Sequence, residues 1–123
     1  MPFDAAVSPD CRRVAWIGDR GTGSGQEDLF VADADGSHRL RLTSDPTDEW
    51  FPAWSADGKR IVFVDRPTIQ VIGADGTGRL TVSRCGGSCA GTGWPIWSPD
   101  GTQIAFANAR VGGWHIWIMN ADG

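Results

Sequence analysis

The chain has few of the residues on which enzyme active sites usually depend. Its 123 residues include no tyrosine, two histidines and three cysteines. A Ser–His–acid triad needs a histidine held against the nucleophile, but His38 follows a predicted turn and His115 begins a predicted strand. Residues 86–90, GGSCA, do not complete a Gly-x-Ser-x-Gly elbow. We therefore expect a protein that is not itself an enzyme and has no cofactor.

Long apolar runs and excess positive charge are also lacking. No segment approaches the roughly 20 apolar residues that span a bilayer, so we expect no membrane insertion. The formal net charge is −4, whereas a nucleic-acid surface is normally basic. Residues 1–10 have neither the charged nor the apolar region of a signal peptide. The protein is therefore either cytoplasmic or a mature segment without its leader.

What the chain does contain is a ten-residue phrase in three copies. It reads VSPDCRRVAW from Val7, WSADGKRIVF from Trp54 and WSPDGTQIAF from Trp97, so the equivalent serines are 47 and then 43 residues apart. The triplet ADG repeats in step, at residues 34–36, 74–76 and 121–123. A period of this length, built from short strands and turns, indicates a radial or stacked repeat.

Each repeat divides into short predicted strands. After each copy's first strand, β-branched and aromatic residues favour strand over helix, and Asp-Gly between apolar runs is a hairpin signal. Four antiparallel strands per repeat of this length make a propeller blade. The later strands are predicted at Arg60–Val64 and Gln103–Ala107 (second), Asp28–Ala32, Thr68–Ile72 and His115–Met119 (third), and Arg39–Thr43 and Arg79–Ser83 (fourth).

The residues WSPDGTQIAF and HIWIMNADG resemble the TolB-type (WD40-like) β-propeller repeat, whose blades carry W-S-P-D-G, an I-A-F strand and an I-Y/W-x-M-N-A-D-G strand. The resemblance covers nearly the whole chain, although Val7 replaces Trp, Cys11 replaces Gly and Ala56 replaces Pro. It implies an all-β propeller with blades at residues 1–46, 47–91 and 92–123. The third blade lacks its outer strand, because the sequence stops at Gly123.

Three blades are fewer than the four to eight of closed propellers, and segment 115–119 would form an exposed apolar edge. Either two chains join as half-rings, or the sequence is a piece of a longer chain. TolB-type propellers commonly have six blades, and isologous pairing is the commonest form of oligomer. We therefore expect a homodimer that forms a six-bladed ring.

Alternation of hairpins assigns the connections to two faces. The S-x-D-G and A-D-G turns lie on one face, where serine and aspartate side chains would cap the turns, and the repeated tryptophans would pack between blades. These structural repeat residues are Ser8, Asp10, Ser55, Asp57, Ser98, Asp100, Trp54 and Trp97. The other face carries loops of differing length, 18–28, 44–50, 65–67, 84–94 and 108–114. Variable loops on a regular scaffold are where binding usually lies.

Three sets of residues on the variable face are candidates for ligand binding, and each has a structural alternative. A ring of Arg20, Arg66 and Arg110 would hold a carboxylate or phosphate, or each would pair with a neighbouring acid such as Asp19 or Asp65. Asp45, Asp48 and Glu49 would coordinate Ca²⁺ or form a solvated acidic loop, which we favour. Trp50, Trp94 and Trp114 would form an aromatic platform or pack between blades.

The cysteines add little. Cys85 and Cys89 flank a Gly-Gly-Ser spacer and would form a local disulfide in an oxidising compartment or remain free thiols. Their spacing does not fit the paired C-x₂-C pattern of zinc sites, so we predict no metal there. Cys11 occupies a turn position that is glycine in the other two copies.

The resemblance implies a non-catalytic module for protein–protein or small-ligand binding, in the periplasm or outside the cell. Two other classes stay open. Similar repeats form the propeller of prolyl-oligopeptidase-type peptidases, in which a separate hydrolase domain carries the chemistry. A lyase or hydrolase that uses a metal in the propeller channel is the third.

Overall fold

The chain folds as three antiparallel sheets, and no helix occurs among the residues described. The structure, a computed structural model, describes residues 4–19, 21, 23, 25–66, 68–84, 92–110 and 113–122. Within these ranges no helix is long and apolar enough to cross a membrane. The chain is thus an all-β propeller with three blades, as the sequence predicted.

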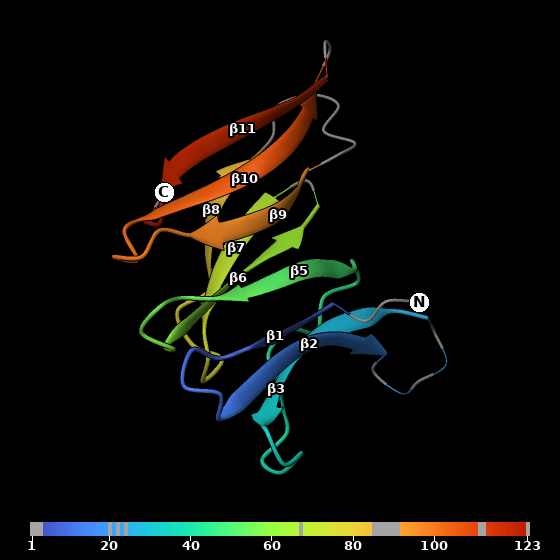
Figure 1. Ribbon diagram of the computed structural model, residues 1–123. Helices are drawn as coiled ribbons and strands as arrows, with labels where there is room; N and C mark the ends of the chain where they lie inside the picture. The colour runs from blue at the N-terminus through green and yellow to red at the C-terminus, as the bar shows by residue number, and fades with distance from the viewer. Residues whose placement is uncertain are drawn as a thin grey trace.

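Each sheet is an up-and-down meander in which strands adjacent in sequence pair with one another (Figure 1). Blade 1 contains β1 (Ala5–Val7), β2 (Arg13–Asp19), β3 (Glu27–Asp33) and β4 (Leu40–Arg41). Blade 2 contains β5 (Glu49–Trp54), β6 (Arg60–Asp65), β7 (Thr68–Gly73) and β8 (Leu80–Arg84). Blade 3 contains β9 (Thr92–Trp97), β10 (Gln103–Arg110) and β11 (Gly113–Asn120), with β11 at the outer edge.

The strands differ from the predicted ones mainly in length. Residues 108–114, predicted as a loop, largely continue the β10–β11 ladder, whose last pair is Arg110 with Gly113. The ladder extends because alternate residues on both strands still face the same sides of the sheet. In contrast, β4 covers only Leu40–Arg41 of the predicted Arg39–Thr43, because Leu42 and Thr43 leave the ladder.

The first strands of the three blades lie next to one another at the centre of the chain. β5 contacts both β1 and β9, and Figure 1 shows these three strands in the middle of the view, with β3 toward the bottom and β11 toward the top. The sheets therefore fan out from their first strands, which is the arrangement of blades around part of a propeller axis.

Two apolar cores lie between the blades. The first core joins blades 1 and 2 and contains Ala15, Ile17, Leu29, Val31, Trp54, Ile61, Phe63, Ile72 and Ala74. The second joins blades 2 and 3 and contains Val62, Val64, Ile69, Val71, Val82, Ile104, Phe106 and Ala121. Successive residues of β6, such as Ile61 and Val62, thus point into different cores. Both faces of the strand are buried, which is why its sequence is a continuous apolar run.

A tryptophan joins each blade to the one before it. Trp54 donates its indole N–H to the Ala6 carbonyl at 2.9 Å, and the Arg13 guanidinium lies 4.9 Å from the Trp54 ring centroid. Arg13 also donates to the Gly58 carbonyl at 2.7 Å. The Trp54 ring thus contacts blade 1 through a hydrogen bond and a cation–π contact.

The same set of contacts recurs at the next interface. Trp97 donates to the Ala53 carbonyl at 3.0 Å, the Arg60 guanidinium lies 4.6 Å from the Trp97 ring centroid, and Arg60 donates to the Gly101 carbonyl at 3.1 Å. Cation–π contact and hydrogen bonding thus act together at both interfaces.

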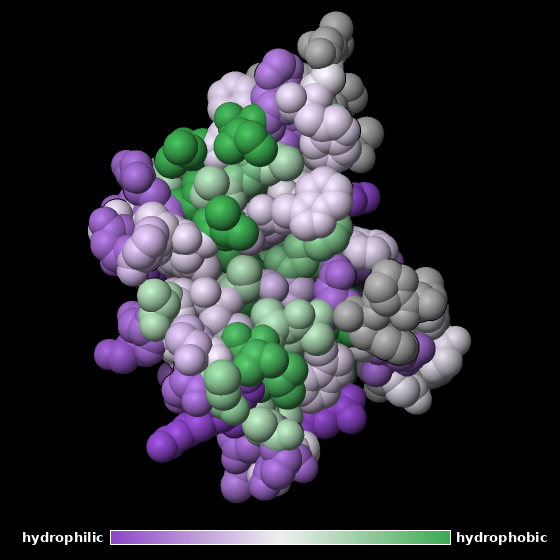
Figure 2. Space-filling view, viewed as in Figure 1, coloured by the Kyte–Doolittle hydropathy of each residue, from purple (hydrophilic) through white to green (hydrophobic). Residues whose placement is uncertain are grey.

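The two outer blades leave apolar faces uncovered. On blade 3, Ile96, Ile116 and Ile118 are 61%, 73% and 67% exposed, and Ala105 and Ala107 pair beside them on the same face. Figure 2, seen from the side on which β1, β5 and β9 are visible, shows strongly apolar side chains gathered over β9–β11 and a second group over β1 and β2. The apolar outer edge predicted for segment 115–119 is confirmed.

Candidate functional site

The two ends of the blades differ, as the alternation of hairpins predicted. At one end, which we call the turn end, the S-x-D-G and A-D-G turns of each blade bond to each other. Their backbone hydrogen bonds run from Ala34 to Arg12 (2.8 Å), from Ala74 to Lys59 (2.9 Å) and from Ala121 to Thr102 (2.8 Å). The opposite end, the loop end, carries the β2–β3, β4–β5, β6–β7 and β10–β11 connections.

Serine and aspartate cap the turns of all three blades. The hydroxyls of Ser8, Ser55 and Ser98 donate to Asp10, Asp57 and Asp100 at 2.6 Å, and each aspartate also accepts the N–H two residues further on at 3.0 Å. These bonds lower the pKa of all three aspartates, and that of Asp100 falls to about 2, with the Ser98 hydroxyl as the largest cause. These hydrogen bonds have the pattern of side-chain turn caps.

A cavity of about 540 Å³ lies between the two turns of blade 2. Its polar groups are already used within the protein. The Asp57 carboxylate accepts from Ser55 and Lys59, the Asp75 carboxylate accepts from Thr77, and the Gly58 carbonyl accepts from Arg13. We therefore regard this cavity as a consequence of the turn geometry, and the loop end as the better candidate for a binding site.

At the loop end the two innermost strands β5 and β9 are distorted at equivalent positions. The pairing register shifts between Trp50 and Ala53 in β5, and opposite β9 it shifts between Ala105 and Ala107. Phe51 and Trp94, at these bulges, have φ values of 54° and 50°. A bulky residue rarely adopts this left-handed conformation, and a bulge re-aims the side chain at that position.

The bulges place aromatic rings along a shallow pocket that we call the aromatic groove. Phe51 and Trp94 have ring centroids 5.1 Å apart, and Trp114 follows 5.6 Å from Trp94. The groove has a volume of about 300 Å³ and is lined by Asp4, Ala5, Phe51, Pro52, Ala53, Trp94, Pro95 and Ile96. The Asp4 carboxylate accepts the Phe51 N–H at 3.0 Å, which holds the bulge in place.

The structure separates the three candidate tryptophans. Trp94 and Trp114 are each 58% exposed and adjacent. Trp94 of blade 3 also contacts Phe51 of blade 2, so packing between blades describes part of its surroundings. Trp50 packs against the second core, as the structural alternative proposed. Phe51 was missed, although its alignment with Trp94, each just before a proline, was a signal that could have found it. Whether these residues bind a ligand stays a prediction.

The predicted arginine ring is only partly described. Arg66 lies 5.6 Å from the Trp50 ring centroid, and Asp65, expected as its ion-pair partner, is bound by Arg79 instead. Arg20 and the side chain of Arg110 lie outside the described residues, so the ring stays a prediction.

The predicted pair of Cys85 and Cys89 also lies outside the described residues, and the disulfide stays a prediction. Cys11 is an exposed free thiol. Its φ of 59° resembles those of Gly58 (71°) and Gly101 (73°), which occupy the same turn position in the other blades.

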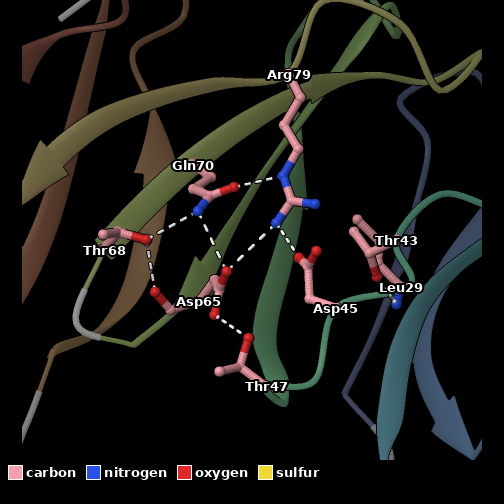
Figure 3. Close-up of polar contacts among 8 residues, drawn as sticks. All are labelled: Leu29, Thr43, Asp45, Thr47, Asp65, Thr68, Gln70 and Arg79. Atoms are coloured by element: carbon pink, nitrogen blue, oxygen red, sulfur yellow. Dashed lines mark hydrogen bonds and ion pairs between the residues drawn. The ribbon is translucent and has the colours of Figure 1, made fainter.

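An acidic cluster forms the second feature of the loop end. One carboxylate oxygen from each of Asp45, Glu49 and Asp65 lies within 4.8 Å of the other two. Figure 3 shows Asp45 and Asp65 facing the Arg79 guanidinium, which pairs with both and also donates to Gln70. Asp48, predicted as a member, is exposed and instead accepts the Glu27 N–H at 3.2 Å.

The expected solvated acidic loop is wrong for Glu49, because its side chain is fully buried. Neither of its carboxylate oxygens has a hydrogen-bond partner among the described residues. Burial raises the pKa of Glu49 to about 8, and the carboxylates of Asp28, Asp45 and Asp65 act in the same direction, while the nearby Thr43 hydroxyl offsets part of the effect. Nothing in the residue pattern indicates this burial, because Glu49 stands in a polar run, SDPTDEW.

Comparisons with known proteins agree with this architecture. The Tol-Pal system protein TolB of Anaeromyxobacter sp. (strain K) is 46% identical over 105 residues, which are 82% of this chain and 23% of that protein. The blades are TolB-type β-propeller repeats. The solved structure of a putative TolB from Agrobacterium tumefaciens matches all of the chain with a TM-score of 0.77 and 24% identity, and the chain covers 47% of it. The structure of TolB from Acinetobacter baumannii also matches all of the chain, with a TM-score of 0.79 and 23% identity, and the chain covers 30% of it.

Enzymes that contain similar blades also match. Dipeptidyl-peptidase 5 of Porphyromonas gingivalis is 38% identical over 64 residues, 50% of this chain and 9% of the peptidase. An oligogalacturonate lyase solved in complex with manganese matches 95% of the chain with a TM-score of 0.74 and 19% identity, and the chain covers 34% of it. No family model matches the chain. The chain thus spans less than a quarter of the length of either curated relative described here.

Proposed function

We propose that this TolB-type propeller segment is a non-catalytic binding module, and that the aromatic groove at its loop end receives an extended peptide segment of a partner protein. The observation that carries the proposal is the pair of equivalent bulges at Phe51 and Trp94. Strained backbone at a bulky residue costs of the order of 1–3 kcal/mol and is found where function requires it.

The chemistry of the groove favours an apolar peptide. Trp94 and the adjacent Trp114 are each 58% exposed. Pro52, Pro95 and Ile96 are apolar residues of the groove lining. Large aromatic side chains are typical of the residues that contribute most of the binding energy at protein interfaces. The groove is lined by neither histidine nor cysteine, so it offers binding surface and no nucleophile–base pair.

A peptide-display selection against the purified protein tests the proposal. Selected apolar peptides should bind the wild-type protein at least tenfold more tightly than the double variant Trp94→Ala, Trp114→Ala. Lys59→Ala, at the turn end, serves as the matched control and should bind as the wild type does. Equal binding by the aromatic double variant and the wild type would disprove the role of the groove.

We further propose that a second copy completes the ring. At both internal interfaces an arginine of one blade stacks on a tryptophan of the next. Gln103 stands where the next arginine would be, and Val7 stands where the preceding tryptophan would be. If blade 3 of one copy meets blade 1 of another, Gln103 and Val7 face each other where the internal interfaces have an arginine and a tryptophan. The new interface then contains neither member of the arginine–tryptophan pair, so neither is left without its partner.

The solution mass tests this assembly. The dimer should have about twice the chain mass of 13.2 kDa over a wide range of dilution, and Ile116→Lys with Ile118→Lys should reduce it to the monomer. A well-folded wild-type monomer would contradict the proposal. A periplasmic or extracellular site of action follows from the TolB resemblance and is part of the same proposal.

The alternative is that the segment belongs to a larger enzyme, which the match to dipeptidyl-peptidase 5 favours. In that case the blades guide a peptide toward a separate catalytic domain. An α/β-hydrolase segment encoded in the same reading frame would decide for this alternative, and it would leave the aromatic groove as a substrate contact.

A further inference from the structure

Several arginine side chains lie over aromatic rings in the described part of the chain. Arg13 and Arg60 do so at the two interfaces between blades, 4.9 and 4.6 Å from the ring centroids of Trp54 and Trp97. Each of these guanidinium groups also donates a hydrogen bond to a glycine carbonyl of the next blade, at 2.7 and 3.1 Å. The fold therefore holds a guanidinium group by combining an aromatic ring with an oxygen acceptor.

The aromatic groove contains rings of the same kind, but no arginine of this chain covers them. The rings of Phe51, Trp94 and Trp114 adjoin one another, with centroids 5.1 and 5.6 Å apart and interplanar angles of 36° and 57°. Among the described residues, no arginine lies over any of these three rings. Trp94 is 58% exposed, so it is accessible to a cation of a partner, which its ring would attract.

Asp4 supplies an oxygen acceptor in the same groove. Its Oδ2 accepts the Phe51 N–H at 3.0 Å, and its backbone carbonyl accepts the Ile17 N–H at 2.9 Å. These two bonds fix the position of Asp4. Within the described ranges its carboxylate makes no other hydrogen bond and no ion pair. The second oxygen, Oδ1, is thus an acceptor for a ligand, and the negative charge of the carboxylate favours a cation over an anion.

We propose that the aromatic groove recognises one arginine of the bound peptide, whose guanidinium stacks on Trp94 and donates to Oδ1 of Asp4. This inference rests on the proposed function and adds the residue that the groove selects. A guanidinium stacks through its flat face and donates through its edge at the same time, whereas a lysine ammonium is a compact point charge. The groove volume of about 300 Å³ is at the lower end of the range for ligand pockets, which suits one large side chain with apolar neighbours.

A peptide-display selection with one fully randomised position between apolar flanks tests the arginine. The library is selected in parallel against the wild type, Asp4→Asn and Asp48→Asn. Arginine should be enriched at least fivefold at the randomised position by the wild type, and this enrichment should disappear with Asp4→Asn, which keeps a side-chain oxygen for the Phe51 N–H. Asp48→Asn is the matched control, because it removes the same charge from a loop-end carboxylate outside the groove, and it should keep the enrichment.

Synthetic copies of the most enriched peptide measure the contribution of the charge. Calorimetry should show that the arginine peptide binds the wild type at least tenfold more tightly than a copy with citrulline, which has a similar shape but no charge, and more tightly than a copy with lysine. The ratio of arginine to citrulline affinity should fall below threefold in Asp4→Asn. If that variant folds poorly, the citrulline comparison on the wild type decides alone.

The outcomes separate this inference from the proposed function. Peptides that bind through Trp94 and Trp114 without arginine enrichment, or that bind equally well with citrulline or lysine, would overturn the inference and leave the proposed function intact. An unchanged arginine preference in Asp4→Asn would overturn the role of Asp4. A selection that returns no binding peptide would overturn both proposals.

Discussion

The turn end and the loop end of the blades satisfy their polar groups in opposite ways. At the turn end, each capping aspartate accepts a serine hydroxyl and a backbone N–H, and the pKa of each is lowered. At the loop end, Glu49 is buried with no hydrogen bond among the described residues, and its pKa is raised to about 8. The loop end also holds the two bulky residues with left-handed backbone in the inner strands, Phe51 and Trp94.

This difference agrees with the proposal that the turn end stabilises the blades and the loop end binds a partner. Consistent local choices favour a single folded structure, whereas departures from them concentrate at functional sites and are supported by the rest of the fold. The turn end repeats the same bonds three times and locks adjacent blades through tryptophan. The loop end departs from these rules at Glu49, Phe51 and Trp94, and two of these residues, Phe51 and Trp94, line the proposed aromatic groove.

The sharpest test of the comparison uses two tryptophans of the same strand, β9. Trp97, near the turn end, packs against the second core, bonds to Ala53 and stacks with Arg60. Trp97→Ala should lower the free energy of unfolding by about 3–5 kcal/mol, as expected for loss of a core aromatic. Trp94→Ala, three residues earlier, should cost less than about 1 kcal/mol, because Trp94 is 58% exposed.

Denaturant unfolding of the two variants under identical conditions measures both values. Since the wild-type stability is itself expected to be modest, Trp97→Ala should be compared at low temperature and in the presence of a stabilising osmolyte. Similar losses in the two variants would show that the ends do not differ as described.

A second comparison removes the turn cap itself. Ser55 is 1% exposed, donates to Asp57 and accepts the Arg60 N–H at 3.0 Å. Ser55→Ala leaves that N–H without its partner and should cost about 1–3 kcal/mol. In Ser98→Ala the same bonds are exposed to solvent, so water replaces them and the loss should stay below about 1 kcal/mol.

Thermal midpoints of Ser55→Ala and Ser98→Ala measure this difference. A loss in Ser98→Ala equal to that in Ser55→Ala would mean that burial does not decide the strength of the cap. A neutral Ser55→Ala would mean that the turn end contributes no stability through its caps.

The fold could be predicted from the sequence because the same sequence pattern recurs in every blade. Three copies of one phrase, which reads W-S-x-D-G in the second and third, determine the hairpin turns, the faces and the two inter-blade tryptophans, all of which depend on local chemistry. The site depends on contacts between blades and on backbone geometry. The bulge at Phe51 is not encoded by a glycine, and the approach of Asp45 and Asp65 to Glu49 needs the register of β5 against β6. Neither is visible in residue spacing.

One position breaks the pattern of the turn end and can be restored. Cys11 takes the left-handed conformation that glycine adopts at Gly58 and Gly101. A non-glycine residue there costs roughly 1–2 kcal/mol, part of which glycine loses again through the entropy of the unfolded chain. Cys11→Gly should therefore stabilise the protein by about 1 kcal/mol, measured as a shift of the denaturation midpoint.

Cys11→Ala is the matched control for this substitution. It also removes the exposed thiol but keeps the strained backbone, so it should leave stability unchanged. Equal stabilisation by alanine and glycine would assign the gain to loss of the thiol and not to relief of strain.

The smallest expected effect concerns acid. The folded-state pKa of Asp100 is about 2, below its ordinary value of 3.8, chiefly because of the Ser98 hydroxyl. Its contribution to stability is therefore fully present above about pH 4 and is lost as the pH falls toward 2. Asp100→Asn still offers an oxygen to Ser98 and Thr102 but does not titrate. The wild type should lose stability more steeply than the variant between pH 4 and pH 2, and parallel pH profiles would show that the turn caps do not act through charge.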